Sequence, residues 1–375
     1  MSVSKLNLRR VVNASGKMSI LGVSTLSDEV VEAIKEGAQR YYEMEELHHK
    51  AGQYIAEQLK TEGALITNSA SSAIALAIAG LITKGDSYFV EHLYEINQSL
   101  HREVLIMMGH LINYGAPIST MIQLGGGEVK SVGYANGCTM NQIEAAITNR
   151  TVAIVYVQSH HTVQKSMPPL KEISSLAQKH NIPLIVDAAA ETNIMVYSNY
   201  ADLIIWSGSK ALEGPTSGIL AGKKNYVDFA RMHNQGIGRA MKIGKESIFG
   251  LLQAIDQYNW QEISKEQQLE RLSHFECLND LNGITVSIHQ DESKREIYRA
   301  RILVDEKSVS TPATHIVQAL KEGEIAIYTR DYHANNGYFE IDPRTIDDQD
   351  IPLIINKFKE TLEARSPIIT DEDFT

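Results

Sequence analysis

Residues 204–218 read Ile204-Ile205-Trp206-Ser207-Gly208-Ser209-Lys210-Ala211-Leu212-Glu213-Gly214-Pro215-Thr216-Ser217-Gly218. An apolar run ends in small and hydroxyl residues, and a single lysine follows before a turn rich in glycine and proline. This order predicts a buried strand followed by a turn that carries Lys210. Such a lysine is either an ordinary solvated side chain or an amine that packing keeps neutral for covalent chemistry.

The composition describes a soluble globular protein with two domains. The chain has 375 residues, of which 43% are hydrophobic and 22% charged. Its net charge of −11 gives no general attraction for nucleic acid, so an anionic ligand needs a local basic pocket. Residues 1–10 lack an apolar signal segment, and 64–83 are too polar to span a bilayer. We therefore expect a cytoplasmic protein without a membrane partner.

Metal binding is not expected. Cys138 and Cys277 are too few for a disulfide framework or a zinc site, which fits a reducing cytosol. The adjacent pairs His48-His49 and His160-His161 are poor metal ligands, because neighbours in sequence rarely point the same way.

Short apolar strands alternate with helices over residues 27–221. Strands are predicted at 64–67, 87–90, 105–108, 128–132, 151–157, 183–186, 201–206 and 217–221. Helices are predicted from Ser27 to Tyr41 and at 46–60, 70–79, 92–103, 118–124, 139–148 and 169–180. Uniformly apolar strands between helices are typical of an α/β fold, with a parallel or mixed sheet covered on both faces.

The two ends of the chain differ from this pattern. Residues 1–26 are expected to form an irregular arm, and one long helix is predicted over 247–271. Strands at 284–288, 299–304 and 325–328, with helices at 311–321 and 349–364, predict a smaller α+β domain. We divide the chain into an arm with a helix (1–45), a large domain (46–245), and a linking helix with a small domain (246–375).

Three chemically suited positions follow predicted strand ends. The turn Ser69-Ala70-Ser71-Ser72 opens a helix, and its N–H and hydroxyl groups suit a phosphate or simply cap that helix. Asp187 ends a buried strand, and Lys210 follows the next one. Strand ends of a parallel sheet meet at one edge. Pyridoxal phosphate needs a lysine, a carboxylate for its ring nitrogen and a phosphate site, so the sequence predicts this cofactor, with Ser207 adding a hydroxyl.

Several stretches resemble a known family. The chain resembles pyridoxal-phosphate enzymes of the aspartate-aminotransferase fold (fold type I), in the branch related to bacterial selenocysteine synthase. Within that branch it is most similar to the D-glucosaminate-6-phosphate ammonia-lyase group. The resemblance implies a mixed, mostly parallel seven-stranded sheet and a smaller C-terminal α+β domain. The stretches that carry it are Arg10 to Gly16, Asn113 to Pro117, Ala135 to Thr139, Ser159 to Lys165, Val186 to Glu191 and Ser207 to Gly218.

The resemblance also implies roles for particular residues. Lys210 is the Schiff-base lysine, and Asp187 is the partner of the pyridinium nitrogen. His161 or His110 lies against the cofactor ring, although either is equally well explained as a structural histidine.

Substrate contacts are expected from a second set of residues. Arg330, at the end of a small-domain strand, is expected to bind the substrate carboxylate. Arg239, Lys242 and Lys245 lie on a glycine-rich segment and form either a substrate-phosphate site or a solvated charge run. Asn13 in the arm is a further expected substrate contact.

The expected reaction is an α,β-elimination on a 2-amino sugar acid 6-phosphate, giving ammonia and a 2-keto-3-deoxy acid phosphate. Selenium or sulfur transfer to seryl-tRNA is the first alternative, although the acidic charge and the early start of the cofactor core speak against it. Racemisation, aldol cleavage and desulfuration use the same cofactor residues, and a non-catalytic cofactor-binding protein is a third class. We expect a homodimer or a higher homo-oligomer.

Overall fold

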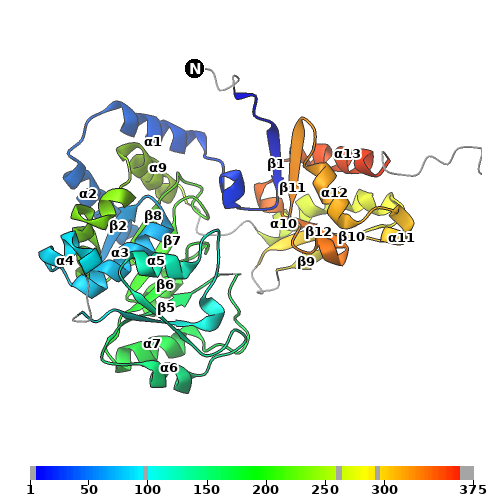
Figure 1. Cartoon of the computed structure of the whole chain (residues 1–375). Helices are drawn as coiled ribbons and strands as arrows, with labels where there is room; N and C mark the ends of the chain where they lie inside the picture. Colours follow the sequence, from blue (N-terminus) through cyan, green and yellow to red (C-terminus); the bar gives the residue numbers. More distant parts are fainter. Residues whose placement is uncertain (1–5, 96–99, 160, 259–263, 292–295, 364–375) are drawn as a thin grey trace, which may run out of the picture. The chain divides into compact units, whose positions relative to one another are not determined.

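The chain forms two compact units. The computed structural model describes residues 6–95, 100–159, 161–258, 264–291 and 296–363. One unit spans Ser24–Trp260, and the other combines Met1–Val23 with Gln261–Thr375 (Figure 1). The sequence-based boundaries at 45 and 245 do not coincide with these units. The helix after 246 belongs to the first unit, and the N-terminal arm belongs to the second.

A seven-stranded sheet forms the centre of the 24–260 unit. Its strand order is β2-β8-β7-β6-β5-β3-β4. β8 runs opposite to the other six strands of the sheet, and those six strands therefore end at the same edge. The strands are β2 (Gly63–Thr67), β3 (Glu103–Met107), β4 (Glu128–Val132), β5 (Thr151–Val157), β6 (Leu184–Asp187), β7 (Leu203–Ser207) and β8 (Gly218–Gly222).

Helices cover both faces of this sheet, as the apolar strands predict. Along β5, Ile154 and Tyr156 pack into one layer, and Val155 and Val157 pack into the other. The first layer contains α2 (Met44–Leu59), α6 (Met140–Ala146), α7 (Leu170–Lys179) and α9 (Lys245–Asp256), with α1 (Asp28–Gln39) packed on α9. The second contains α3 (Ala70–Thr83), α5 (Ile118–Leu124) and α8 (Lys224–Met232). None of the helices in the described ranges is long and apolar enough to cross a membrane.

The other unit holds two small sheets. β1 (Arg10–Ala14) pairs in parallel with β11 (Ile325–Thr329), and the two strands lie side by side in Figure 1. An antiparallel sheet has the order β12-β10-β9. The remaining elements are β9 (Ile284–Gln290), β10 (Tyr298–Val304), β12 (Tyr338–Ile341), α10 (Lys265–Ser273), α11 (Glu306–Val309), α12 (Ala313–Leu320) and α13 (Asp350–Glu363). Alternating residues of these strands and the apolar faces of α12 and α13 form its core.

Two predictions around residues 87–103 are wrong. The expected strand at 87–90 is the helix α4 (Ser87–Glu91), because the Asp86 carboxylate accepts hydrogen bonds from the N–H groups of Tyr88 and Phe89 and caps a helical turn. The expected helix at 92–103 is also absent from its described residues: Leu93–Glu95 is a single 3₁₀ turn, and β3 begins at Glu103. Residues 96–99 lie outside the described part of the chain.

Two further predictions are wrong, for the helix at 247–271 and for the arm at 1–26. The expected helix at 247–271 is two helices: α9 ends at Asp256, and the Ser264 hydroxyl starts α10 by accepting from the Gln267 N–H at 3.3 Å. Residues 259–263 between them are not described. The expected irregular arm contains β1, because residues 10–14 find a partner strand more than 300 residues away.

Candidate active site

The carboxyl edge of the seven-stranded sheet brings the predicted cofactor residues together. In the register β2-β8-β7, Gly218 pairs with Thr67 on one side and with Ser207 on the other. A Cβ added to Gly218 would lie 2.5 Å from the Ala70 nitrogen and still closer to the Ser69 carbonyl group. Because only glycine permits this approach, Gly218 lets the start of α3 lie against the turn that carries Lys210.

The start of α3 is built for an anion. The Ser69 hydroxyl accepts from the Ser72 N–H at 3.1 Å and caps the helix, while the Thr67 hydroxyl donates to the Ser69 carbonyl at 2.7 Å. The Ser72 hydroxyl donates to the Asn68 side chain at 2.6 Å. The N–H groups of Ala70 and Ser71, in the same first turn, have no preceding helical carbonyl to bind, so they remain available to a phosphate.

Asp187 is buried and Lys210 is partly buried, and each charge influences the other. Burial raises the pKa of the Asp187 carboxyl, and the positive charge of Lys210 with the Ala189 N–H, at 3.1 Å, opposes only part of that rise. Burial lowers the pKa of the Lys210 ammonium, and the Asp187 charge offsets part of that fall. The lowered pKa of Lys210 favours a neutral amine, which can attack an aldehyde carbon. A cationic ring nitrogen beside Asp187 would in turn favour the ionised form of its carboxyl group.

Hydrogen bonds fix the turn that carries Lys210. The Gly208 N–H donates to the Ser217 carbonyl at 3.0 Å, and the Gly214 N–H donates to the Gly208 carbonyl at 2.8 Å. The Ser24 hydroxyl donates to the Ser209 carbonyl at 2.8 Å. Lys210 therefore projects from a rigid support at the edge of the sheet.

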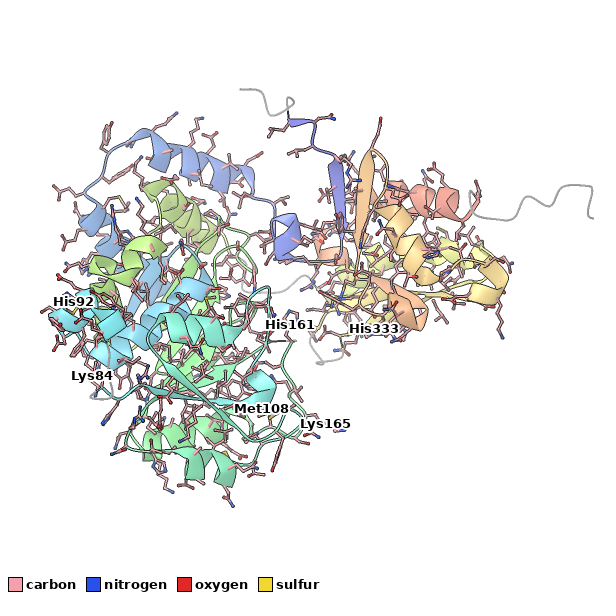
Figure 2. The ribbon with its side chains drawn as sticks, in the orientation of Figure 1. Lys84, His92, Met108, His161, Lys165 and His333 are labelled. Carbon is pink, nitrogen blue, oxygen red and sulfur yellow. The ribbon has the colours of Figure 1, made fainter. Side chains whose placement is uncertain are left out.

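The two candidate histidines have different surroundings. His110 is fully buried, its Nδ1 accepts from the Val157 N–H at 3.1 Å, and its ring meets Tyr156 edge-on at 4.7 Å between centroids. Burial lowers the pKa of His110 to about 4. His161 is exposed on the loop after β5, and Figure 2 shows it at an edge of the 24–260 unit. His161 is therefore the more accessible of the two to a ligand.

The predicted basic segment lies partly beside the α3 start. The Asn68 N–H donates to the Met241 carbonyl at 3.2 Å, which places the 3₁₀ turn Ile237–Met241 against the serine turn. Arg239 and Lys242 are exposed there.

Lys245 has a different position from its two neighbours in the basic segment. Its ammonium donates to the Gly37 and Ala38 carbonyls, at 2.6 and 2.7 Å, and so binds the last turn of α1. These contacts give Lys245 a structural role that competes with the predicted substrate contact.

Arg330 is mostly buried in the other unit, and within the described part of the chain its ion pair with Glu340 is a long one. Its backbone bridges to Glu340, but its Nε lies 3.9 Å from the Glu340 carboxylate and makes no hydrogen bond within the described residues. Glu340 is bound instead by Arg301, at 2.9 and 3.2 Å. Burial lowers the pKa of Arg330, and the nearby charge of Arg299 lowers it further.

A buried carboxylate organises the arginines around Arg330. Asp342 is fully buried and accepts from Arg299 at 3.0 Å and from Arg344 at 2.7 and 2.8 Å. The described charged groups of this cluster are four guanidiniums and three carboxylates, from Arg299, Arg301, Arg330, Arg344, Asp291, Glu340 and Asp342. Among these described groups, the guanidiniums outnumber the carboxylates by one.

Asn13 closes a turn in the same unit. Its side-chain nitrogen donates to the Gly16 carbonyl at 2.9 Å, and its side-chain oxygen accepts from the Ser15 N–H at 3.0 Å. The structure places Asn13 at the carboxyl end of β1, beside Tyr328 of β11 in register. Its predicted contact with a substrate therefore competes with a role in the turn.

Sequence reasoning missed one polar residue at the sheet edge. Tyr114 follows β3, and its hydroxyl lies 3.1 Å from the Ser71 hydroxyl at the start of α3. The stretch 113–117 contributes to the family resemblance, and nothing in it indicates contact with residue 71. In the described part of the chain, no group of three or more His, Cys, Asp or Glu side chains is arranged to hold a metal ion.

Comparison with known proteins agrees with this architecture. The family described as SelA, L-seryl-tRNA selenium transferase, matches residues 11–283. The chain is 39% identical over 361 residues to D-glucosaminate-6-phosphate ammonia lyase of Salmonella typhimurium, covering 96% of this chain and 97% of that protein. The chain belongs to the family described as SelA. A second relative, 5'-C-glycyluridine monooxygenase-decarboxylase of a Streptomyces species, is 34% identical over 96% of this chain and 92% of its own length.

Solved structures confirm the fold class. A structure of D-glucosaminate-6-phosphate ammonia-lyase superposes with a TM-score of 0.89, at 38% identity, over 96% of this chain and 98% of that one. Serine palmitoyltransferase of Sphingomonas wittichii superposes with a TM-score of 0.57, at 13% identity, over 95% of this chain and 88% of that one. The predicted fold type I architecture and the predicted family of pyridoxal-phosphate enzymes are therefore confirmed.

Proposed function

We propose that this protein is a pyridoxal-phosphate-dependent ammonia-lyase that acts on a 2-amino sugar acid phosphate such as D-glucosaminate 6-phosphate. The placement of Asp187 at the end of β6 and of Lys210 just after the neighbouring parallel strand β7 carries this proposal. The 39% identity to the Salmonella ammonia lyase over nearly the whole chain supports the reaction class. The products would be ammonia and a 2-keto-3-deoxy acid phosphate.

The residues present fit the cofactor. The first turn of α3 offers N–H and hydroxyl donors for its phosphate, Asp187 offers a buried carboxylate for its ring nitrogen, and Lys210 offers an amine with a lowered pKa. When bound, pyridoxal phosphate supplies an electron sink for the charge left when the substrate Cα loses a proton.

The protein side chains would carry out the proton transfers and the binding. Lys210 would hold the cofactor covalently, and its amine, once released by the substrate amine, is the base that we assign to the Cα proton. Loss of the C3 hydroxyl as water needs an acid, and His161 is our candidate because it is exposed on the loop that follows β5. Asp187 would keep the ring nitrogen protonated.

Anion-binding side chains support a phosphorylated acid as the substrate. Arg330 combines a guanidinium with an incomplete counter-charge, which suits a carboxylate. Arg239 and Lys242 are exposed cations on a segment beside the α3 start, which suits a phosphate. We do not assign such a role to Lys245, whose ammonium binds the end of α1.

Incubation of the purified protein with pyridoxal phosphate and a substrate panel tests the proposal. The panel contains D-glucosaminate 6-phosphate, the same acid without phosphate, and common amino acids, and ammonia and 2-keto acid are measured for each. We expect both products from the phosphorylated acid. Lys210→Ala should lose the yellow absorbance of covalently held cofactor and the activity, whereas Lys171→Ala, at an exposed position of α7, should keep both. Turnover by Lys210→Ala would refute the assignment.

Identity to the Streptomyces relative favours a second candidate function. That relative is named as a monooxygenase-decarboxylase of 5'-C-glycyluridine, and it matches 96% of this chain. A reaction of that kind would consume oxygen and release carbon dioxide from an amino acid attached to a nucleoside. Running the assay under argon separates the two: ammonia release that continues without oxygen supports the lyase, and carbon dioxide release that requires oxygen supports the alternative.

A further inference from the structure

Tyr114 is held on a closed turn at the carboxyl edge of the sheet. Asn113 and Pro117 form a bridge across the turn, and the Tyr114 N–H donates to the Ala116 carbonyl at 3.3 Å. The Asn113 side chain accepts from the Gly115 N–H at 3.0 Å, and Gly115 has a φ of +111° that favours glycine. The turn therefore fixes the backbone that carries the Tyr114 side chain without help from α3.

The side chain has an apolar body and a polar end. Its ring packs against the apolar layer formed by α3, α5 and the strands. Its hydroxyl lies 3.1 Å from the Ser71 hydroxyl, in the first turn of α3 where the phosphate of the cofactor is expected. The packed ring and the closed turn both restrict the position of the hydroxyl, which lowers the entropy lost when it binds a ligand.

The surroundings of Tyr114 favour its protonated hydroxyl. Burial raises the pKa of the Tyr114 phenol, and the negative charge of Asp187 raises it further, while the hydrogen bond with Ser71 opposes part of this effect. A neutral phenol has one proton to donate and two lone pairs, so it can bind Ser71 and an anion at once.

We infer that Tyr114 is a cofactor-binding residue whose hydroxyl, paired with that of Ser71, binds the phosphate group of pyridoxal phosphate at the start of α3. This inference rests on the proposed function, since it assumes the same cofactor in the same place. Tyr114 would thus add a hydrogen-bonding side chain from the loop after β3 to the phosphate-binding residues that follow β2. The competing explanation is that the contact only ties the 113–117 turn to α3.

Titration of the apoenzyme with pyridoxal phosphate and with pyridoxal, which lacks the phosphate, separates these explanations. Binding is followed by the fluorescence of the buried Trp206, so the readout does not depend on activity. Tyr114→Phe should weaken pyridoxal phosphate about tenfold and pyridoxal by less than about twofold, because it removes one hydrogen bond to a charged group. Ser71→Ala should show the same selectivity.

Two further variants sharpen the test. The double variant Tyr114→Phe with Ser71→Ala should lose less than the product of the two single losses, because each single change already breaks the shared hydrogen bond. The matched control is Tyr54→Phe on α2. It removes a tyrosine hydroxyl that donates to Asp256 at 3.0 Å, and it should leave the affinities for pyridoxal phosphate and for pyridoxal unchanged. Circular dichroism and the urea midpoint verify that each variant is folded.

The outcomes distinguish this inference from the proposed function. If the wild-type protein does not bind pyridoxal phosphate, the proposed function itself fails. If the wild type binds and Tyr114→Phe binds equally well, the inference is overturned while the proposed function stands. Equal weakening of pyridoxal and pyridoxal phosphate would also overturn it, because the hydroxyl would then act through the turn and not on the phosphate.

Discussion

Acid should destabilise this protein through His110. The side chain is fully buried and accepts a hydrogen bond from the Val157 N–H, so protonation of Nδ1 would break that bond and bury a charge. Burial lowers the pKa of His110 from 6.5 to about 4. Between these values the unfolded chain binds a proton that the folded chain does not, so the free energy of unfolding falls as the pH falls.

The size of the effect follows from the two pKa values. At pH 7 both states are mostly neutral at this position, and the contribution is small. At pH 5 the unfolded imidazole is protonated and the folded one is not, which lowers the free energy of unfolding by about 2 kcal/mol relative to pH 7. The loss reaches about 3 kcal/mol below pH 4, where both states bind the proton.

Urea unfolding followed by the fluorescence of buried Trp206 measures this slope. In His110→Asn, the side-chain oxygen can accept from Val157 as Nδ1 does, but it does not titrate. The difference between wild type and variant should therefore change by about 2 kcal/mol between pH 7 and pH 5. Parallel pH profiles for wild type and His110→Asn would refute the reasoning.

Three other substitutions give measurable outcomes. Gly218→Ala forces a Cβ against the Ser69 carbonyl group, so urea unfolding should show a loss of about 2 kcal/mol, and titration should show weakened binding of pyridoxal phosphate. Arg330→Lys replaces a planar guanidinium with a compact charge, so steady-state kinetics should show KM raised about tenfold with a smaller change in kcat. Lys245→Met removes two donors from the end of α1, so it should cost about 1 kcal/mol in urea unfolding and leave KM unchanged.

Each of these three substitutions has a control variant or an outcome that would contradict its expected effect. Gly137→Ala is the control for Gly218→Ala, because its added Cβ would meet nothing closer than 3.5 Å, and it should change neither stability nor cofactor affinity. A KM unaffected by Arg330→Lys would remove the arginine from substrate binding. A raised KM in Lys245→Met would restore the substrate role that its contacts with α1 argue against.

The part of the site that could be predicted from sequence is encoded within short stretches of neighbouring residues. Asp187 and Lys210 each follow an apolar run long enough to be recognised as a strand, and parallel strands end at one edge, so their meeting required no long-range information. The Ser69 cap likewise depends on residues within one helical turn. These features were therefore predictable from the chain alone.

The missed features depend on contacts between distant residues. Tyr114 and Ser71 are 43 positions apart, and neither stretch carries a pattern that reports the other. His110 could not be told from a ligand-facing histidine, because its burial depends on Val157 and Tyr156 of another strand. The helix at 87–91 is an exception, because its Asp86 cap is local and competes with apolar residues that suit a strand.

The pairing of β1 with β11 sets a condition on synthesis at the ribosome. Residues 10–14 emerge before their partner at 325–329 exists, and at about 5 to 20 residues per second the gap lasts about 15 to 60 seconds. During that time the 24–260 unit can complete its sheet, while β1 waits with unpaired N–H and C=O groups. Arg9 and Arg10 stand at the start of this strand, where charge discourages pairing with other nascent chains. A chain truncated before residue 325 would leave that strand permanently without its partner.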